Sequence, residues 1–484
     1  MIEKHKQMLR ADWAVVGMML LYAAYISTYS VQKHWTFQTT GYDLSLYVQS
    51  LWNTLHGDFL RLTVAPGVRH FLSWYFTPSV VLLTPVYALW PSPVTLLIVQ
   101  SVVVALGAWP VFRLAKEQVD APWLAAGYAC IYLVFPALLA ANLYDFHGIT
   151  LTAPLLIWTW YLAQRRRWIA FGVVAAITAG FREEAALSLI MMALLLVADP
   201  TRRRAGIWTV IGSAIWFVLL VMIAVPMVRA TSVYMDQISR FGYLGSSPAQ
   251  VLTNLVAHPQ LVLNEMSRPE KIGYLLHLFA PVGYLPVFAP VMLLPVLPTL
   301  VMNLMAAYPP AYSPVLFQYN APLPPFIVLA AAMGSGRLAR WIGAHSARRR
   351  SLAHVGLLAF TLFMSAGYQL KLGYLPFSPT FHWPQITSHH QLGLQIAESI
   401  PPDATVSAQN QLAPHVSNRR TVYIFPYVAE ADYVFLDSTL IAFLSYNARD
   451  AEEVNRMTQQ LLVDPRYTLV LQQDGYLLLK RIAG

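Results

Sequence analysis

The sequence predicts a mostly α-helical, polytopic membrane bundle followed by a small extracytoplasmic α/β domain. Of its 484 residues, 57% are hydrophobic and only 11% are charged, whereas roughly a quarter of the residues in a soluble protein are charged. Apolar stretches of membrane-spanning length recur between residues 12 and 370, and the segment that follows lacks them. We therefore expect a transmembrane bundle over 1–372 and a separate domain over 373–484.

Clusters of lysine and arginine between the apolar stretches predict the topology. They are Lys4, Lys6 and Arg10; Arg113 and Lys116; Arg165 to Arg167; Arg202 to Arg204; and Arg337, Arg340 and Arg348 to Arg350. The positive-inside rule places all of them in the cytoplasm, so consecutive clusters are separated by an even number of crossings. The net charge of +9 is then a topology signal, and no nucleic-acid partner is expected.

This constraint predicts about eleven transmembrane helices in the plasma (inner) membrane, with the N-terminus in the cytoplasm and the C-terminal domain outside. Their ranges are 12–30, 93–115, 121–141, 149–164, 168–181, 185–198, 205–226, 272–288, 290–306, 321–336 and 352–370. The stretch 78–90 is too short to span the hydrocarbon. Residues 31–92 therefore form a long extracytoplasmic loop with surface helices, and 227–270 form a second outer loop.

Helical and strand patterns alternate in the tail. "QLGLQIAESI" and "AEEVNRMTQQLLVD" have helical periodicity, while "TVYIFP", "DYVFLD" and "TLVLQQDGYLLLK" resemble strands. Asp474-Gly475 is a hairpin signal. The tail has no dinucleotide fingerprint, phosphate loop or CxxC pair. Cys130, the only cysteine, lies in an apolar run, so no disulfide framework is expected.

The predicted topology gathers most of the unusual polar residues on the outer side. They are Asp43, Arg69 and His70 in the first outer loop, Asp145 and His147 in "NLYDFHG", and Arg182, Glu183 and Glu184 in "FREE". Carboxylates, imidazoles and a guanidinium next to a membrane bundle mark a functional site by default. We expect the three loops to line one extracytoplasmic cavity.

Each group also has a structural interpretation. Asp43 can be the N-cap of an amphipathic helix on the bilayer surface, whose apolar stripe is Leu44, Tyr47, Val48, Leu51 and Trp52. Asp145 and His147 can satisfy backbone groups of a turn. The "FREE" charges can snorkel to the interface from helix ends.

Two further points concern the charge string and the tail. The helices before and after "FREE" are short, so they span fully only if they continue into it. Glu183 and Glu184 would then lie about 100° apart and could not both face one cavity.

His389 and His390 are expected to be surface residues, because an adjacent pair is a poor chelating spacing.

Several motifs together resemble a family of polytopic membrane proteins known only as a domain of unknown function. They are "YDLSLYVQSLWNTLHG", "LLTPVYALWPSPVTLLIVQS", "ANLYDFHGITL", "FREEAALSL" and "IPPDATVSAQNQLAPHVSNRRTVYIFP". More remotely, the layout resembles the GT-C superfamily of lipid-linked-sugar glycosyltransferases. In that resemblance Asp43 matches an acidic residue of the first outer loop, Asp145 matches a second polar site, and Arg182 lies where a basic residue is often found near the donor phosphate.

The resemblance implies transfer of a sugar from a polyprenyl-phosphate-linked donor to an acceptor at the outer face of the bilayer. Asp43 would be the base, and Arg182, Arg69 and His70 would hold the phosphate. Asp145, His147 and Glu183 would orient the acceptor or bind a divalent cation such as Mg²⁺ or Mn²⁺. Two other functions stay open: a transporter or lipid flippase, and a membrane scaffold that anchors the tail.

Overall fold

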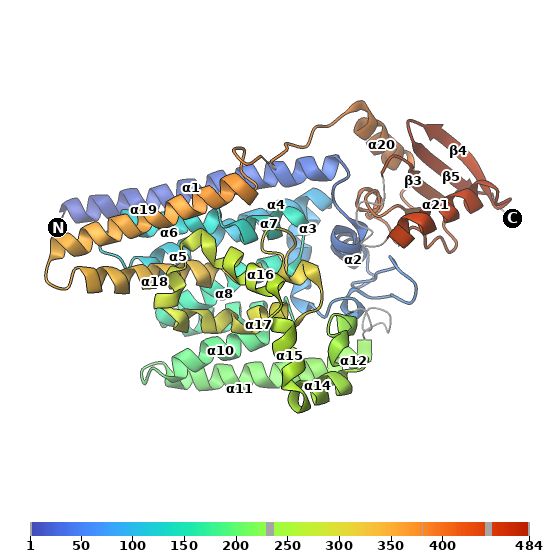
Figure 1. Ribbon diagram of the computed structural model, residues 1–484. Coiled ribbons are helices and arrows are strands. Elements are labelled where there is room, and N and C mark those ends of the chain that lie inside the picture. The colour runs from blue at the N-terminus through green and yellow to red at the C-terminus, as the bar shows by residue number, and fades with distance from the viewer. Residues whose placement is uncertain (1, 229–236, 380, 441–447, 483–484) are drawn as a thin grey trace. The chain divides into compact units, whose positions relative to one another are not determined.

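The computed structural model describes residues 2–228, 237–379, 381–440 and 448–482 (Figure 1). The described chain is mostly helical, and its sheet lies entirely in the C-terminal tail. It divides into two compact units. The first is Met1–Ser27, Phe76–Ser79 and Val99–His382, and the second is Thr28–Tyr75, Val80–Ile98 and Trp383–Gly484. The predicted fold class, a mostly α bundle with a small α/β domain, is confirmed.

The bundle accounts for most of the helices. Two of them, α1 (Ile2–Trp35) and α4 (Pro93–Leu106), run from one unit into the other. The others in the first unit are α5 (Ala108–Ala115), α6 (Pro122–Leu133), α7 (Pro136–Tyr144), α8 (Gly148–Gln164), α9 (Trp168–Ala179), α10 (Ala185–Val197), α11 (Arg203–Leu219), α12 (Val225–Val228), α14 (Pro248–Ala257), α15 (Pro259–Met266), α16 (Pro269–Phe279), α17 (Leu297–Met305), α18 (Pro324–Ile342) and α19 (Ala347–Leu372). Figure 1 shows α10 alongside α11.

Four helices in the described residues are long and apolar enough to cross a membrane: Lys6–Trp35, Pro93–Ala115, Arg203–Val228 and Ala347–Leu372. The pair α6 and α7 adds a fifth if it is one span bent by 42°. The bend lies at Pro136, whose ring removes a backbone donor. Other apolar helices, such as α9 and α10, are shorter. The count of eleven crossings stays a prediction.

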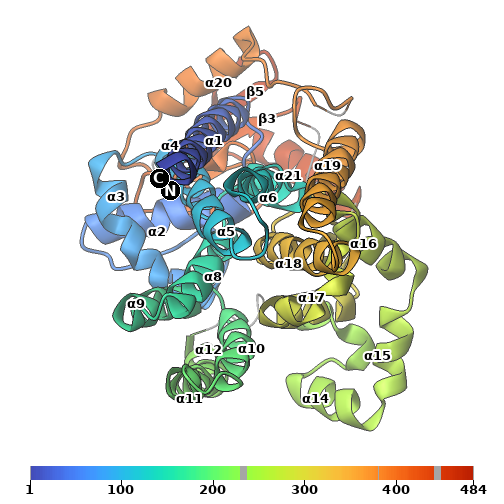
Figure 2. The same ribbon diagram turned by 90° about the vertical axis from the view of Figure 1, so that its left-hand side faces the viewer.

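Helix α18 forms the centre of the first unit. It contacts α5, α6, α8 and α19, which lie above and to the left of it in Figure 2. Small residues allow these close approaches. A Cβ on Gly334 would lie 2.2 Å from the carbonyl oxygen of Leu285, and Ser335 accepts a hydrogen bond from Tyr128.

The helix predicted over 272–288 is only partly present, because α16 ends at Phe279, whereas the helix predicted over 290–306 begins as a 3₁₀ turn that leads directly into α17. Three 3₁₀ turns, η6 (Ala280–Val282), η7 (Leu285–Phe288) and η8 (Pro290–Val296), lie between α16 and α17. Each contains a proline, which cannot donate the backbone hydrogen bond of a longer helix. The predicted outer loop 227–270 contains α14 and α15, and its residues 229–236 lie outside the described ones.

The charge string is a turn rather than helix. Helix α9 ends at Ala179 and α10 begins at Ala185. The predicted position of the string, in the loop between two helices, is confirmed. The helices do not continue into it, so the condition for full spanning is not met and the helical spacing of Glu183 and Glu184 does not apply.

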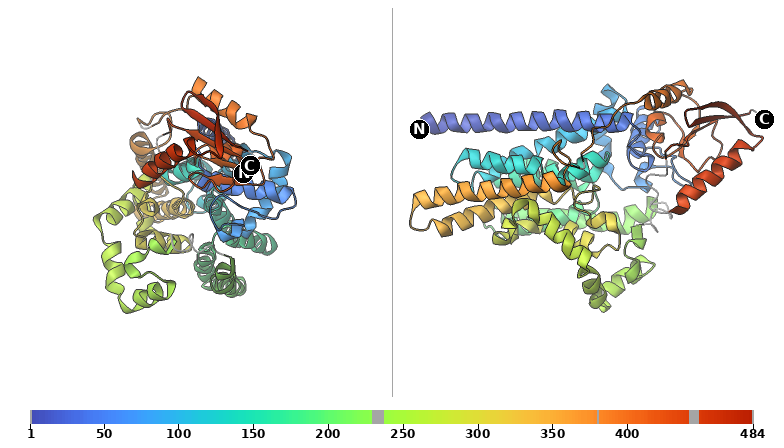
Figure 3. Two further views of the ribbon diagram at one scale, coloured as in Figure 1. Left: turned by 90° about the vertical axis from the view of Figure 1, so that its right-hand side faces the viewer. Right: turned by 45° about the horizontal axis from the view of Figure 1, so that its top comes forward.

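The second unit contains a five-stranded mixed sheet in the order β2-β1-β3-β5-β4, seen with its helices in Figure 3. Its strands are β1 (Val406–Ala408), β2 (Val422–Ile424), β3 (Tyr433–Asp437), β4 (Tyr467–Gln473) and β5 (Tyr476–Arg481). Strand β1 is parallel to β2 and β3, whereas β3, β5 and β4 are antiparallel. The predicted strands and the Asp474-Gly475 turn, both at positive φ, are confirmed; β1, three residues long, was not predicted.

The predicted helices of the tail are present as α20 (Ser388–Ser399) and α21 (Ala448–Leu462). Helix α21 packs on one face of the sheet, where Leu461 joins a core with Val434, Leu436 and Leu479.

Most of the first outer loop, all but Phe76–Ser79, belongs to the same unit as the tail, which differs from the predicted division at residue 372. Its elements are η1 (Gly41–Ser45), α2 (Leu46–Leu55), η2 (Phe71–Ser73), η3 (Pro78–Leu83) and α3 (Thr84–Leu89). Gln49 Nε2 donates to the carbonyl oxygen of Arg420 at 3.1 Å, and Tyr87 donates to Asn418 Oδ1 at 2.5 Å. Loop and tail therefore share one core.

Helix α2 is buried on both of its faces. The predicted stripe residues Leu44, Tyr47, Val48 and Leu51 are buried, and so are the polar residues on the other side, including Gln49. The prediction of an amphipathic helix lying on the bilayer surface is therefore wrong, because protein covers the polar face as well.

Candidate functional site

Asp43 lies in the second unit, on the π-helical turn η1 that leads into α2. The N-cap of this turn is Thr40, so the interpretation of Asp43 as the N-cap is wrong. Thr40 Oγ1 donates to Asp43 Oδ2 at 2.9 Å. The carboxylate is half-buried and one of its oxygens is held in place.

His70 and Arg69 also lie in the second unit. His70 is the N-cap of η2, and its Nδ1 accepts from the backbone N–H of Leu72 at 3.2 Å. Burial lowers the pKa of His70, against an opposing hydrogen bond to the backbone of Phe59, and this favours the neutral ring. The neighbouring Arg69 is exposed.

Aromatic contacts bring the segment after His70 against the Asp43 turn. Tyr42 stacks on Trp74 with centroids 5.8 Å apart, and Tyr47 contacts Phe71 at 5.0 Å. The two parts of the first outer loop that carry predicted site residues are therefore packed together.

Asp145 and His147 lie in the first unit, in the extended link between α7 and α8, and both are almost fully buried, at 2% and 3% exposure. Asp145 Oδ1 accepts from the N–H of Phe146 at 2.9 Å. The His147 ring stacks on Tyr144 with centroids 5.6 Å apart. The interpretation of this segment as a turn that satisfies backbone groups is thus true of Asp145, but it does not explain why both side chains are buried.

Gln100, a buried residue of α4, holds this link with both ends of its amide. Nε2 donates to the carbonyl oxygens of Asn142 at 3.1 Å and Asp145 at 2.7 Å, and Oε1 accepts from the N–H of His147 at 2.8 Å. Sequence reasoning missed this residue. Its only signal is an amide within the apolar run "TLLIVQSVVV".

The "FREE" turn contains a partly buried ion pair. Arg182 Nε and Nη2 both lie 3.0 Å from Glu184 Oε1, and Glu184 is buried. The side chain of Arg182 is 23% exposed. Intramolecular pairing, rather than snorkelling alone, therefore positions the guanidinium.

This turn packs beside the Asp145–His147 link. A Cβ on Gly148 would lie 3.2 Å from the carbonyl oxygen of Phe181 and 3.3 Å from Thr77 Cγ2. The N–H of Ser79 donates to the carbonyl oxygen of Gly180 at 3.0 Å. Two of the three predicted loops are thus side by side within the first unit. A cavity shared with the Asp43 loop of the second unit stays a prediction.

No group of three or more His, Cys, Asp or Glu side chains that could hold a metal ion occurs among the described residues. The candidate ligands Asp145, His147 and Glu183 belong to those residues and do not form such a group. We therefore do not assign them a divalent cation.

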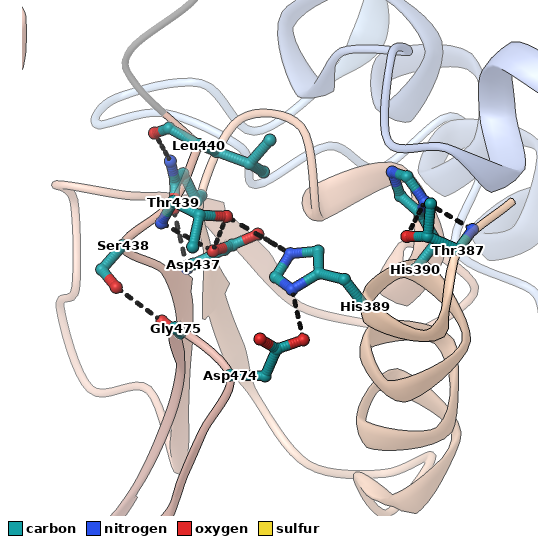
Figure 4. A network of polar contacts seen from close by, with 10 residues as sticks. Thr387, His389, His390, Asp437, Ser438, Thr439, Leu440, Asp474 and Gly475 are labelled. Atoms are coloured by element: carbon teal, nitrogen blue, oxygen red, sulfur yellow. Dashed lines mark hydrogen bonds and ion pairs between the residues drawn. The ribbon is translucent and has the colours of Figure 1, made fainter. Parts of the chain in front are cut away.

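The tail contains a titratable cluster that sequence reasoning missed, centred on His389 of α20 (Figure 4). Its Nε2 lies 2.9 Å from Asp437 Oδ2 at the end of β3, and its Nδ1 lies 2.9 Å from Asp474 Oδ2 in the β4–β5 turn. The ring stacks on Tyr476 with centroids 4.4 Å apart. His389 is thus a bridge between α20 and the sheet, and the prediction of a plain surface residue is wrong.

Replacing His389 by Asn should remove a pH dependence from the packing of α20. Burial alone would lower the pKa of His389, but hydrogen bonds and charges from Asp437 and Asp474 outweigh it and raise the pKa above 6.5. A raised pKa means that the protonated ring stabilises the fold below about pH 6.5, and that this contribution is lost as the pH rises through the raised value. Amide hydrogen exchange in α20 should therefore be several-fold faster in the variant at low pH only.

His390→Asn is the matched control, because burial and the neighbouring His389 lower the pKa of His390. The neutral ring of His390 is the form that stabilises the fold, so its contribution to the free energy of unfolding is lost as the pH falls. The ratio of the α20 amide exchange rate in His389→Asn to that in the wild type should therefore change with pH. A ratio that is the same at every pH would contradict a stabilising role for the protonated His389 ring.

The chain is similar to a known family in sequence and to solved structures in fold. The model of a family described as "Predicted membrane protein (DUF2079)" matches residues 33–478. No curated protein matches the sequence. Two crystal structures of ArnT from Cupriavidus metallidurans, one bound to undecaprenyl phosphate and one in the apo state, are similar in structure. They are 10% and 12% identical, cover 97% of this chain and 98% of their own, and give TM-scores of 0.48 and 0.47.

Proposed function

This chain belongs to the DUF2079 family of predicted membrane proteins, and from that premise we propose that it transfers a sugar from a polyprenyl-phosphate-linked donor at the extracytoplasmic face of the plasma membrane. The observation that carries the proposal is the packing of the buried Asp145–His147 link beside the turn that contains the Arg182–Glu184 pair. Ionisable groups buried inside a membrane bundle are costly and are retained for function.

The donor phosphate needs cationic hydrogen-bond donors, because negative charge develops on it as the sugar leaves. Arg182 supplies a planar fork of N–H groups suited to phosphate oxygens. Glu184 fixes the plane of that fork through two of its nitrogen atoms. Arg69 and His70 are further candidates for phosphate contact.

Asp43 is the proposed base. The acceptor hydroxyl oxygen attacks the anomeric carbon of the donor sugar, and its proton passes to the Asp43 carboxylate. The bond from the anomeric carbon to the phosphate oxygen breaks, and polyprenyl phosphate leaves with that electron pair. Asp145, His147 and Glu183 orient the acceptor in this scheme.

Arg182→Gln should weaken donor binding by about 10- to 100-fold, the expected effect of losing hydrogen bonds to a charged group. Binding is measured by native mass spectrometry on the full chain with undecaprenyl phosphate and its hexose conjugate. Arg202→Gln is the matched control, since Arg202 follows the other end of α10, has the same 23% side-chain exposure, and pairs with Asp199. Equal losses in both variants would show that Arg182 has no specific part in binding.

The same experiment separates the alternative functions. Retention of the lipid-linked hexose with release of polyprenyl phosphate supports transfer, whereas retention without sugar release supports a transporter or flippase. The bent pair α6–α7 and the proline-broken segment 280–296 are features that transporters share. No retention of either lipid by the wild type would exclude both functions and favour a scaffold.

A further inference from the structure

The first turn of the Asp43 helix is capped from the other end of the chain. The N–H of Gly41 donates to the carbonyl oxygen of Asn410 at 2.7 Å and to its Oδ1 at 2.9 Å, and the N–H of Tyr42 donates to the same Oδ1 at 3.2 Å. These N–H groups are among those that the start of a helix leaves without an intrahelical partner. A residue 369 positions away thus takes the part that a local N-cap side chain usually plays.

The local N-cap residue serves the carboxylate instead. Thr40 makes no side-chain cap hydrogen bond, and its hydroxyl donates to Asp43 Oδ2 at 2.9 Å. Capping by Asn410 therefore allows the Thr40 hydroxyl to fix one oxygen of Asp43.

Close packing between the turn and the sheet supports this arrangement. A Cβ on Gly41 would lie 2.9 Å from Ile424 Cδ1 and 3.0 Å from Ala413 Cβ, so a larger residue would have to displace these side chains. Ile424 ends β2, and Asn410 follows β1, the central strand of the parallel part of the sheet. The turn is therefore packed against the parallel part of the sheet.

We propose that Asn410 is a positioning residue for Asp43: by capping residues 41 and 42 it sets the direction of the carboxylate that takes the acceptor proton. This inference rests on the proposed function, because it names the residue that prepares the same base. It also gives the tail a part in the reaction, as the support that holds the base in place.

Asn410→Ala in the full chain should lower kcat by roughly 10- to 100-fold, the effect expected of a small misplacement of a reacting group, with KM for the donor changed less than about threefold. Amide exchange at residues 41 and 42 should accelerate by roughly tenfold, in keeping with a lost cap. Asn410→Asp keeps the oxygen acceptor and should restore most of the exchange protection. Its added charge near the turn should move the acid limb of the pH–rate profile upward, because a nearby like charge raises a carboxyl pKa.

Asn418→Ala is the matched control. Asn418 also joins the tail to the outer loop, through Tyr87 and the carbonyl oxygen of Pro91, but it does not touch the Asp43 turn. Unchanged kcat in Asn410→Ala, or an equal loss in Asn418→Ala, would overturn the positioning assignment. If instead Asp43→Asn keeps turnover, the proposed function fails, and the exchange of residues 41 and 42 still decides whether Asn410 holds the turn.

Discussion

Asp43→Asn should lower kcat for sugar transfer by about 10²- to 10⁴-fold, the usual contribution of a general base. The amide has the same shape and can still accept the hydrogen bond from Thr40, so folding and membrane insertion should be unaffected. What it cannot do is take a proton from the acceptor hydroxyl. Release of polyprenyl phosphate from the lipid-linked hexose measures the effect.

Asp58→Asn provides the comparison within the same outer loop. Asp58 pairs with Arg61 at 3.4 Å and Arg420 at 3.3 Å, and such exposed pairs contribute little. We expect near-wild-type turnover from this variant. Wild-type kcat in Asp43→Asn would remove Asp43 from the mechanism.

Gln100→Leu should have the second large effect, on both stability and turnover. It removes three hydrogen bonds that hold the Asp145–His147 link, in a region where buried polar groups cost about 1–3 kcal/mol each when unmatched. We expect the free energy of unfolding to fall by about 2–4 kcal/mol and kcat to fall at least tenfold. Amide exchange of His147 reports the loosening of the link directly.

Two further variants make the Gln100 result interpretable. Ser101→Ala is the adjacent control, because Ser101 accepts a 3.4 Å hydrogen bond from Asn142 but is not a partner in the three bonds of Gln100. This variant should behave like the wild type. Gln100→Glu keeps the acceptor for the N–H of His147 but places a carboxylate against two carbonyl oxygens. If Gln100→Leu and Ser101→Ala were equally active and equally protected from exchange, Gln100 would have no role in ordering the site.

Local patterns in the sequence predict the elements well. The apolar helix predicted over 352–370 lies within α19, and Asp474-Gly475 forms the expected turn, in which both residues adopt positive φ. The apolar stripe of α2 also correctly predicts a helix. The stripe does not predict which residues cover the opposite face of α2, because that burial depends on a hydrogen bond from Gln49 to the carbonyl oxygen of the distant Arg420.

The sequence likewise predicts some residues of the candidate site and misses others. Asp145, His147 and Arg182 stand out as polar residues in an apolar chain, and sequence alone identifies them. Gln100 and Asn410 act through hydrogen bonds to backbone groups, which leave no pattern in a single sequence. His389 is a similar case, because its partners Asp437 and Asp474 come from separate parts of the sheet.

The sequence separation between Gly41 and Asn410 also affects folding during synthesis. At about 5–20 residues per second, a ribosome needs roughly 20–70 s to add the 369 residues from the one after Gly41 up to Asn410. During that time the nascent outer loop has no sheet to pack against, and exposed apolar surface promotes aggregation. The stripe of α2, buried in the finished protein, gives the unfinished helix a face that can rest on the bilayer until the tail is synthesised.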